Sequence, residues 1–561
     1  KCPPWTIQAT EMLHDNKKKT IYYDNAVIKV YDIPILYIPK LSHPDPTVKR
    51  RSGFLTPSFS DTKNLGSNIS VPYFWAINHD KNFTLTNNFY ASENPLFLGE
   101  YHQDFKILNL LADFGYTEGY KNISATKKRG DKSHFFTKIV KKFNNNNSDS
   151  ENSFDLSVQH VSNDKYLKLY KIKSNLVDYN TNNLENSLNF THEDDNLFLG
   201  FNTSVYETLN ENYNDKYEYI LPEVTLEKNL ISNQRFGSVD LQSNYKFHNY
   251  DTNKSSNFFV NNLNWQFKEF NFSSGVIGKF LGTIKNINYE TKNIDLYKQD
   301  TTNELFGAIG YLTEINLKKT QIDSEHLLKP KIFLRYAPGS MRQETSSSRL
   351  NPLIAFNIDR LDNNNNFETG LTSSLGLDYK YKKNGKDFDF SVAQIVNDKE
   401  NKKMASESSL DEKLSDMVGS ANYKINDNFN LNYNFALDQN YNEFNYNEIG
   451  TAINLNSVNL NLSYLKEIQH IGNQEYFKTK LQFENKDRGV FSLETKRNLV
   501  TNSAEFYNLS YEYLNDCLRA GIVYRREFYN DSEIEPENSL MFKVTITPFG
   551  NINSPSFNQY K

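Results

Sequence analysis

The stretch Asn428-Phe-Asn-Leu-Asn-Tyr-Asn-Phe-Ala-Leu-Asp438 decides the fold of this 561-residue chain. Large apolar side chains occupy every second position, and asparagines fill most of the positions between them. Successive side chains of a β-strand point to opposite faces, so this period predicts a strand with one apolar and one polar face. The apolar face comprises Phe429, Leu431, Tyr433, Phe435 and Leu437, and the polar face comprises Asn428, Asn430, Asn432 and Asn434.

The same alternation recurs from about residue 50 to the C-terminus, between turns rich in Asn, Asp, Lys and Ser; clear examples are 457–464, 507–513 and 540–547. The chain contains 40 Phe and 36 Tyr, which suit the aromatic girdles of a membrane barrel. A soluble sandwich would favour Val, Ile and Leu on its buried faces and would split into domains with linkers. We therefore predict an all-β protein with a large transmembrane antiparallel β-barrel. At ~10 residues per strand and as many per connection, it holds roughly 24 to 28 strands.

Composition excludes several other classes of protein. The mean hydropathy is −0.69, and no apolar run is long enough for a membrane-spanning helix. A net charge of −5 without a basic stripe argues against nucleic-acid binding. The sequence has no Gly-x-Ser-x-Gly elbow, phosphate-binding glycine loop, zinc-spaced cysteine pair or His-Glu-x-x-His. We therefore expect no enzyme activity, no catalytic residues, no cofactor and no metal.

The N-terminal part has a different texture. Residues 20–39 form two β-rich runs punctuated by Pro34 and Pro39, with apolar residues on both faces, as in a sandwich or jelly roll. So short a piece cannot complete a domain. We expect residues 1–48 to be the end of such a β-sandwich or jelly roll, which the resemblance described below implies to be a jelly roll, and residues 49–561 to form the barrel with its loops. The sequence begins at Lys1 and shows neither an initiator Met nor a signal peptide. We therefore interpret the chain as a mature or truncated piece.

Two polar tracts are predicted to be loops. Residues 363–366 are four consecutive asparagines, and residues 397–415 are rich in Lys, Glu and Ser without strand alternation. We expect both tracts to be solvated loops outside the barrel wall.

Only two cysteines occur, Cys2 and Cys517, at opposite ends of the chain. They are either two unrelated thiols or a single disulfide that ties the N-terminal segment to the last part of the barrel. A disulfide would require an oxidising compartment such as the periplasm.

An ordered series of motifs resembles the LptD (OstA) family of outer-membrane lipopolysaccharide-assembly proteins. The series covers some 75 residues, and a looser match follows at 350–370, with Asp359-Arg360 inside it. Its motifs are Trp5-Thr6-Ile7, His14-Asp15, Tyr23-Asp24-Asn25-Ala26, Ile33-Pro34-Ile35-Leu36-Tyr37-Ile38-Pro39, His43-Pro44-Asp45, Lys49-Arg50-Arg51-Ser52-Gly53-Phe54-Leu55-Thr56-Pro57 and Pro72-Tyr73-Phe74-Trp75.

The resemblance implies a periplasmic β-jelly roll joined to a barrel of about 26 strands in the outer membrane of a Gram-negative bacterium. Lipopolysaccharide would arrive through the jelly roll, its acyl chains would leave through a lateral gate, and its sugars would cross the lumen. The implied partners are a plug lipoprotein (LptE-like), a periplasmic bridge protein (LptA-like) and the barrel-assembly machinery. The alternative function is a large porin-like or receptor-type barrel for solute uptake.

The resemblance also assigns a lateral gate between the first and last strands. Pro57 falls in the expected first strand and Pro72 in the second, and each removes a hydrogen-bond donor from the ladder. The facing residues of the last strand would be Leu540, Phe542, Val544 and Ile546. A simpler reading is that Pro57 ends one strand and Pro72 begins another.

Three further roles are implied by the resemblance. Ile33, Ile35 and Tyr37 would line the acyl-chain path. Arg50, Arg51, Asp359 and Arg360 are candidates for guiding anionic sugars, unless they are simply solvated or paired. Cys2 and Cys517 match family cysteines that form disulfides, although better-known relatives have additional cysteines and two bonds.

Overall fold

The computed structural model describes residues 5–546 except 31, 46, 49, 56, 124–126, 128, 145–149, 210–214, 252, 346–348, 362, 469–472, 486–487, 515–517 and 529–535. Nearly all regular structure in this part of the chain is β-strand, in two separate sheets.

The first sheet is small and antiparallel. It consists of β1 (Trp5–Gln8), β2 (Glu11–Asp15), β3 (Thr20–Val30) and β4 (Ile33–Pro44), with β3 pairing all three others. Both Pro34 and Pro39 lie within β4, the outer strand on its side of β3. Proline is tolerated there because an edge strand leaves some donors unpaired. The assignment of this sheet to a jelly roll, and the boundary at residue 48, stay predictions.

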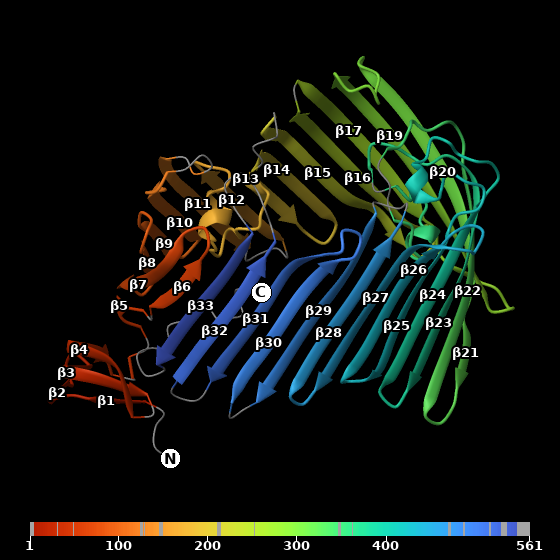
Figure 1. The fold of residues 1–561 in the computed structure, drawn as a ribbon. Helices are drawn as coiled ribbons and strands as arrows, with labels where there is room; N and C mark the ends of the chain where they lie inside the picture. The colour runs from red at the N-terminus through yellow and green to blue at the C-terminus, as the bar shows by residue number, and fades with distance from the viewer. Residues whose placement is uncertain are drawn as a thin grey trace.

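The second sheet closes on itself as an antiparallel barrel (Figure 1). Its strands are β5 (Gly53–Phe54), β6 (Ser58–Thr62), β7 (Gly66–Asn78), β8 (Lys81–Tyr90), β9 (Leu96–Asp104), β10 (Asn109–Gly119), β11 (Arg129–Asn144), β12 (Glu151–Val161), β13 (Asn183–Glu193), β14 (Leu197–Thr208), β15 (Tyr217–Asn233), β16 (Gly237–Tyr250), β17 (Lys254–Gln266), β18 (Phe270–Asn271), β19 (Val276–Lys292), β20 (Thr302–Ile315), β21 (Leu317–Thr320), β22 (Ser324–Ala337), β23 (Gly370–Lys383), β24 (Lys386–Asn397), β25 (Met417–Asn426), β26 (Phe429–Leu437), β27 (Phe444–Leu455), β28 (Val458–Glu467), β29 (Gln474–Asn485), β30 (Gly489–Asn498), β31 (Ser503–Leu514), β32 (Leu518–Glu527) and β33 (Glu537–Ile546).

The short pieces β5, β18 and β21 pair with the same neighbours as β6, β17 and β20, so each is a fragment of an interrupted strand. Over the described residues the barrel therefore has 26 strands, which confirms the predicted all-β barrel and its expected size. Among these residues, no helix has the length and apolar content needed to cross a membrane.

The barrel has two rims that differ in their connections. The small N-terminal sheet lies beside one rim, here called the near rim, and the opposite one is the far rim (Figure 1). β6 runs from the near rim to the far rim, and β33 pairs with it antiparallel, so β33 starts at the far rim. The connections after β12 and after β22 are therefore at the far rim, because strands alternate in direction.

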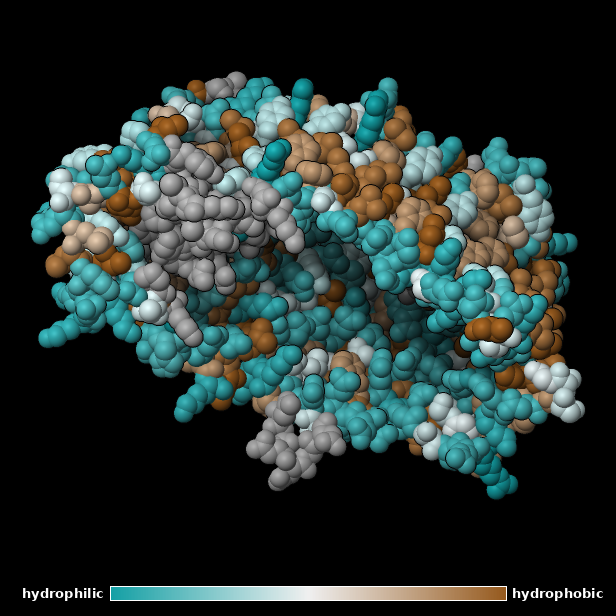
Figure 2. All heavy atoms as spheres, turned by 90° about the horizontal axis from the view of Figure 1, so that it is seen from below, coloured by the Kyte–Doolittle hydropathy of each residue, from teal (hydrophilic) through white to brown (hydrophobic). Residues whose placement is uncertain are grey.

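The strand faces follow the predicted alternation. Phe114, Phe135, Ile309 and Leu334 are all more than 40% exposed on the outer wall. Ala436, on the polar face of β26, is buried against the inside of the barrel at 1% exposure. Seen from the near rim, hydrophilic residues line a hollow, and hydrophobic residues gather on the outer wall (Figure 2). This arrangement is typical of a membrane barrel, whose outer wall contacts lipid and whose lumen contains water.

Three connections at the far rim fold into the lumen in the described part of the chain, and the third, residues 398–416 between β24 and β25, is described in the next paragraph. The first, residues 162–182, contains the helix α1 (Tyr166–Tyr170) and is called the strap below. The second, residues 338–369, contains the 3₁₀ turn η1 (Ile354–Phe356) and is called the inner loop. Each packs in a cluster of buried hydrophobic residues against the barrel wall.

The expectation of solvated loops was wrong for both polar tracts. Asn366 is 2% exposed, and its amide group donates a hydrogen bond to the carboxylate of Glu344 at 3.1 Å. In the second tract, which includes the turn η2 (Ser406–Ser408), Met404 and Leu410 are each 3% exposed within a hydrophobic cluster. The polar groups of both tracts are bonded inside the lumen. The first tract bonds to Asn262 and Lys285 of the wall. The second bonds to the inner loop, where Lys403 donates to the carbonyl of Met341 at 2.9 Å, and to Gln394 of β24.

Candidate functional site

In the described residues, the first strand shares fewer residue pairs with the last strand, across the seam between them, than with β7, to which β6 contributes five pairs and β5 two. In the described residues, β33 pairs with β6 over five residue pairs, from Ser539↔Thr62 to Lys543↔Ser58, whereas β32 and β33 pair over ten. The paired half lies toward the far rim. Toward the near rim, β33 continues to Ile546, and among the described residues, which exclude Thr56, its last three residues pair with β32 and not with the first strand.

The two predicted gate prolines lie where this pairing ends. Pro57 falls between β5 and β6, so the first strand is interrupted rather than continuous at this residue. Pro72 lies inside β7, opposite Thr86 of β8, and its carbonyl accepts a hydrogen bond from the backbone N–H of Leu55 at 2.8 Å. The near half of the first strand is therefore bonded to β7, on the side away from β33. Pro72 does not begin a strand, which rules out that part of the simpler interpretation.

The outward face of the seam is apolar. Leu540 and Phe542 are 46% and 44% exposed, and Phe542 faces Phe59 of β6, itself 49% exposed. The backbone of Val544 and Ile546 belongs to β33, but their side chains lie outside the described residues. Any molecule that left through the seam would first meet a hydrophobic surface.

The two adjacent arginines at the junction bond in opposite directions. Arg50 donates to the carbonyls of Asn78 and His79, both at 2.7 Å, in the near-rim turn after β7. Arg51 donates to the hydroxyl of Thr20 and to the carbonyl of Lys18 at 3.3 Å, in the turn before β3. The pair thus ties the barrel rim to the small sheet. Guiding of sugars by either arginine stays a prediction.

The residues predicted to line an acyl-chain path lie on the surface of the small sheet. Ile33 is 66% exposed and Tyr37 is 57% exposed. The hydroxyl of Tyr37 donates to the side-chain oxygen of Asn25 at 2.7 Å. The side chain of Ile35 lies outside the described residues. The acyl-chain path stays a prediction.

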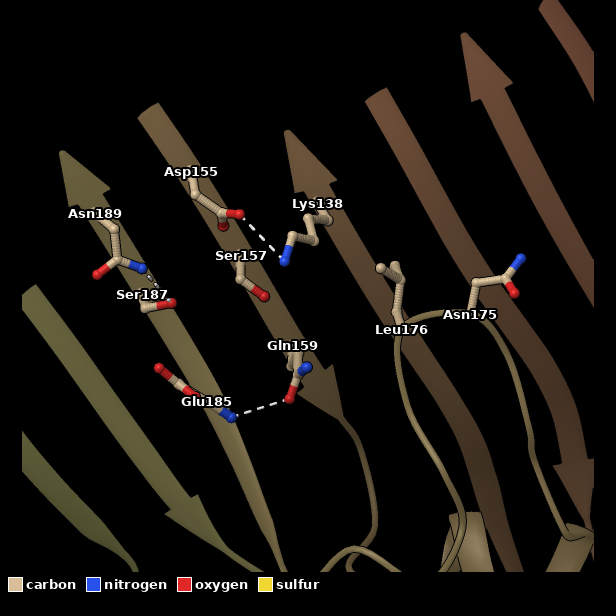
Figure 3. Close-up of a pocket in the computed structure, with 9 residues that line it drawn as sticks. All are labelled: Lys138, Asp155, Ser157, Gln159, Asn175, Leu176, Glu185, Ser187 and Asn189. Carbon is tan, nitrogen blue, oxygen red and sulfur yellow. Dashed lines mark hydrogen bonds and ion pairs between the residues drawn. The ribbon is translucent and has the colours of Figure 1, made fainter. Parts of the chain in front are cut away.

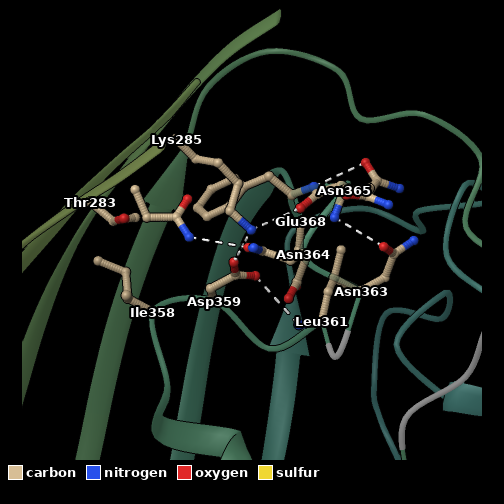
Figure 4. A network of polar contacts seen from close by, with 12 residues as sticks. Thr283, Lys285, Ile358, Asp359, Leu361, Asn363, Asn364, Asn365 and Glu368 are labelled. Carbon is tan, nitrogen blue, oxygen red and sulfur yellow. Dashed lines mark hydrogen bonds and ion pairs between the residues drawn. The ribbon is translucent and has the colours of Figure 1, made fainter. Parts of the chain in front are cut away.

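The inner loop is held by a network of polar contacts with the barrel wall (Figure 4). The ammonium group of Lys285, on β19, bonds the carboxylate of Asp359 at 2.7 Å and the carbonyl of Asn366 at 3.2 Å. Asn364 accepts a hydrogen bond from the amide of Asn262, on β17, at 3.1 Å. Asp359, predicted as a sugar-guiding residue, is therefore engaged in fixing the loop.

Arg360, the second residue of that predicted pair, is buried. Its guanidinium group makes a bidentate ion pair with Glu368, with Nε at 2.7 Å from one carboxylate oxygen, and both residues are 2% exposed. Burial alone would raise the pKa of Glu368, but the charges of Arg360 and Arg335 hold it below its usual value. Arg335, on β22, donates to the carbonyls of Ile358 and Glu368, both at 2.6 Å.

The lumen contains a polar cavity of about 360 Å³ between strands β11 to β13 and the strap (Figure 3). Its walls carry the ion pair of Lys138 and Asp155, at 3.1 Å, and the amide of Gln159. The strap contributes Asn175 and Leu176. Amides and hydroxyls that can both donate and accept suit the hydroxyl groups of a carbohydrate.

Sequence reasoning missed the buried polar residues that fix the strap and the inner loop. Lys285, Arg335 and His134 are each at most 3% exposed and share the inward faces of their strands with buried apolar residues, namely Ile287, Phe333 and Phe136. An inward charge on a membrane strand was the one available signal, because such a charge needs a partner in the lumen. Cys2 and Cys517 lie outside the described residues, so their disulfide stays a prediction.

Comparison with known proteins relates most of the barrel to one family. A family model described as LPS transport system D (LptD) matches residues 140–487. The LPS-assembly protein LptD of Shewanella frigidimarina is 37% identical over 95 residues, which are 16% of this chain and 12% of that protein. The LPS-assembly protein LptD of Methylococcus capsulatus is 33% identical over 116 residues, 19% of this chain and 11% of that protein. The matched stretches thus span only about an eighth of the relatives' own length.

Solved structures give a much weaker likeness. The alcaligin outer membrane receptor FauA from Bordetella pertussis has a TM-score of 0.31 and 8% sequence identity, covering 94% of this chain and 81% of the receptor. The ferric preacinetobactin receptor BauA from Acinetobacter baumannii has a TM-score of 0.32 and 8% identity, covering 92% and 84%. Scores this low carry no argument about the function of this chain.

Proposed function

This chain belongs to the LPS transport system D family, and on that premise we propose that it is an outer-membrane translocon that inserts lipopolysaccharide into the outer leaflet. The acyl chains would leave sideways between β6 and β33, and the sugars would cross the lumen. The near rim, with the small sheet beside it, would face the periplasm.

The short seam is the observation that carries this proposal. An amphiphile must reach the membrane through the wall without exposing its acyl chains to water for long, because burying each CH₂ group in lipid is worth about 0.8 kcal/mol. In the described residues, β33 and β6 share five residue pairs, and this pairing ends at Lys543↔Ser58, before the near rim. A seam that is open toward the near rim would admit acyl chains from the side where the small sheet lies.

The two parts of the cargo would meet matching surfaces. Apolar Phe59 and Phe542 flank the seam on the outside, and polar side chains such as Lys138 and Gln159 line the lumen. As partners we propose lipopolysaccharide, a plug lipoprotein within the lumen, a periplasmic bridge protein at the small sheet and the barrel-assembly machinery. Family membership supports such partners in general terms.

A disulfide across the seam tests the gate. Ser60 and Met541 are direct register partners, and facing residues of antiparallel strands have Cα atoms about 4.5–5.5 Å apart, within the range for a disulfide. We expect the Ser60→Cys/Met541→Cys variant to fold, to be cross-linked under oxidising conditions and to lose delivery of lipopolysaccharide to the cell surface. Delivery should return when the bond is reduced.

The matched control places the bond inside the wall instead of across the seam. Val523 and Met541 are register partners on β32 and β33, so Val523→Cys/Met541→Cys shares one substitution and keeps Cys2 and Cys517. This variant should deliver lipopolysaccharide in both redox states. Full delivery with the seam locked would contradict the proposal, and a locked seam that altered only small-solute uptake would favour a porin-like or receptor-type channel.

A further inference from the structure

The strap reaches from the wall across the inside of the seam. Its helix packs in a hydrophobic cluster with Leu65, which lies in the turn between β6 and β7 on the first-strand side. Tyr170 of the strap meets Tyr90 of β8 edge to face, with ring centroids 6.1 Å apart. On this side of the seam, the strap is therefore bound by apolar packing.

A buried polar chain fixes the start of the strap to the wall. The hydroxyl of Tyr166 lies 3.0 Å from Nδ1 of His134, on β11, and Nε2 of His134 lies 3.2 Å from the carboxylate of Asp113, on β10. Tyr166 is 0% exposed, and His134 and Asp113 are 3% and 5% exposed. Because these groups satisfy one another out of water, the root of the strap is held in one place.

On the other side of the seam, the described residues place two cations between the strap and the last two strands: Lys171 of the strap, and Arg525 of β32, whose guanidinium group lies 6.0 Å from the ring centroid of Tyr179 in the strap. The ammonium group of Lys171 lies 3.2 Å from the hydroxyl of Ser539, 3.6 Å from the carboxylate of Glu537 and 3.8 Å from that of Glu527. Glu527 and Glu537 are direct register partners on β32 and β33. Two facing carboxylates repel each other, and two cations offset the repulsion: Nε of Arg525 lies 2.6 Å from Glu527, and Lys171 pairs with both carboxylates.

The same carboxylate also bridges the seam. Glu537 accepts a hydrogen bond at 3.1 Å from the amide of Asn64, in the turn that follows β6. Asn64 belongs to the first-strand side and Glu537 to the last strand, so this bond closes the far end of the gate. Lys171 thus lies against the group that joins the two strands.

The backbone of Lys171 indicates that its side chain is needed there. Lys171 ends α1 with φ 51° and ψ 44°, the left-handed conformation that glycine adopts most easily at a helix end. A lysine at this position costs conformational energy relative to glycine. Its contacts at the seam supply a physical reason for lysine.

We propose that the strap is an internal latch, in which Lys171 is a positioning residue that holds β33 to the first-strand side at the far end of the seam. The inference rests on the proposed gate and adds the element that keeps it shut. The link is ionic, and Lys171, Glu527 and Glu537 are 19%, 20% and 6% exposed. Because water reaches the lysine, the link breaks more easily than the fully buried root of the strap. The strap releases β33 while it stays attached to the wall.

Hydrogen exchange of the full chain in lipid nanodiscs, without lipopolysaccharide, tests the latch. Lys171→Gly removes the side chain and suits the left-handed backbone, so the helix end should be kept. We expect amides of Ser58–Thr62 and Ser539–Lys543 to exchange roughly fivefold faster, from the loss of one partly exposed ion-pair cluster. Glu537→Gln should act in the same direction, and the double variant should add little more.

Two controls make the result specific. Lys168→Ala removes another lysine of α1, one that bonds Asn182 within the strap at 2.9 Å, and should leave exchange at the seam unchanged. Amides of β22 and β23, which pair over 14 residues, report on the whole barrel. Unchanged exchange at the seam in Lys171→Gly, or equal acceleration in β22 and β23, would overturn the latch.

This test is separate from the test of the proposed function. Exchange is measured without lipopolysaccharide, so the latch can fail while the disulfide experiment still shows that cargo leaves through the seam. Conversely, Lys171→Gly could loosen the seam while the natural chain proves not to deliver lipopolysaccharide. That pair of results would support the latch and overturn the proposed cargo.

Discussion

The strap and the inner loop both fold from the far rim into the lumen, but they are held there by different contacts. The inner loop is fixed by charges that are almost wholly buried, with Arg335, Arg360 and Glu368 at 2% exposure or less. The root of the strap is held by apolar packing and by the buried polar chain that starts at Tyr166, and its contact with the last strand is Lys171, with a side chain that is 19% exposed.

The difference shows which part of the lumen is built to move. A buried bidentate ion pair cannot open without leaving a charge out of water, which costs several kcal/mol. When a partly exposed lysine leaves its carboxylate partner, water solvates the ammonium group, and the loss of the ion pair costs about 1 kcal/mol or less. The permanent contacts lie on β19 to β23, away from the seam, and the releasable contact lies on the seam itself.

Removing the buried cation should give the largest effect. Arg360→Met leaves Glu368 without its bidentate partner and should destabilise the closed inner loop by about 3–5 kcal/mol. The measurement is the opening free energy from hydrogen exchange of amides at 354–357 and 366–368. Exchange in the strap should not change, which would sharpen the contrast between the two segments.

The control for that variant replaces both charges. Arg360→Met/Glu368→Leu should recover most of the lost protection, because an apolar pair of similar volume is often as stable as a buried ion pair. If Arg360→Met were as well protected as the natural chain, the inner loop would be held by its apolar contacts, and the comparison would fail.

Cutting the polar root of the strap should have a smaller effect. Tyr166→Phe removes the hydroxyl that meets His134 and leaves a buried ring nitrogen without that partner, at a cost of about 1–3 kcal/mol. Amides at 166–172 should exchange faster while those of the inner loop stay as they are. Equal loosening of both segments would show that they open as one unit.

Acid should give the smallest effect near neutral pH. Because its folded pKa lies below the usual value, Glu368 contributes stability that is present above the ordinary carboxyl range and is lost as pH falls through the depressed pKa. Protection of the inner loop, corrected for intrinsic exchange, should thus stay constant from about pH 7 to about pH 5 and fall only in stronger acid. Glu368→Gln should lack the acid-dependent loss, and a loss above about pH 5 in the natural chain would contradict this assignment.

The barrel itself could be predicted because its signal is local. The alternation in 428–438 and in 540–546 requires only that neighbouring side chains point to opposite faces, and both stretches form strands. The strand number followed from chain length and the usual size of a membrane strand. The gate prolines were found from the resemblance, and the interruption of the first strand at Pro57 became visible only in the structure.

The polar segments could not be predicted in the same way. Arg360 was considered for sugar guiding, and the tract at 397–415 for a solvated loop, because charged and amide side chains usually lie in water. A barrel lumen is a polar interior, so a polar loop can be buried there if its groups bond to the wall. The role of Lys171 could not be predicted from the sequence, because a single lysine in a segment that connects two strands is common.

The sequence by itself determined the strands, the two faces of the wall and the class of barrel, because each depends on the spacing of residues within about ten positions. Only the tertiary structure decided which strands form the weak seam, which loops fill the lumen and which charges meet. Those features depend on pairs such as Asn64 and Glu537, which are 473 residues apart and approach each other only when the barrel closes. Closure is a property of the whole sheet, and no local pattern encodes it.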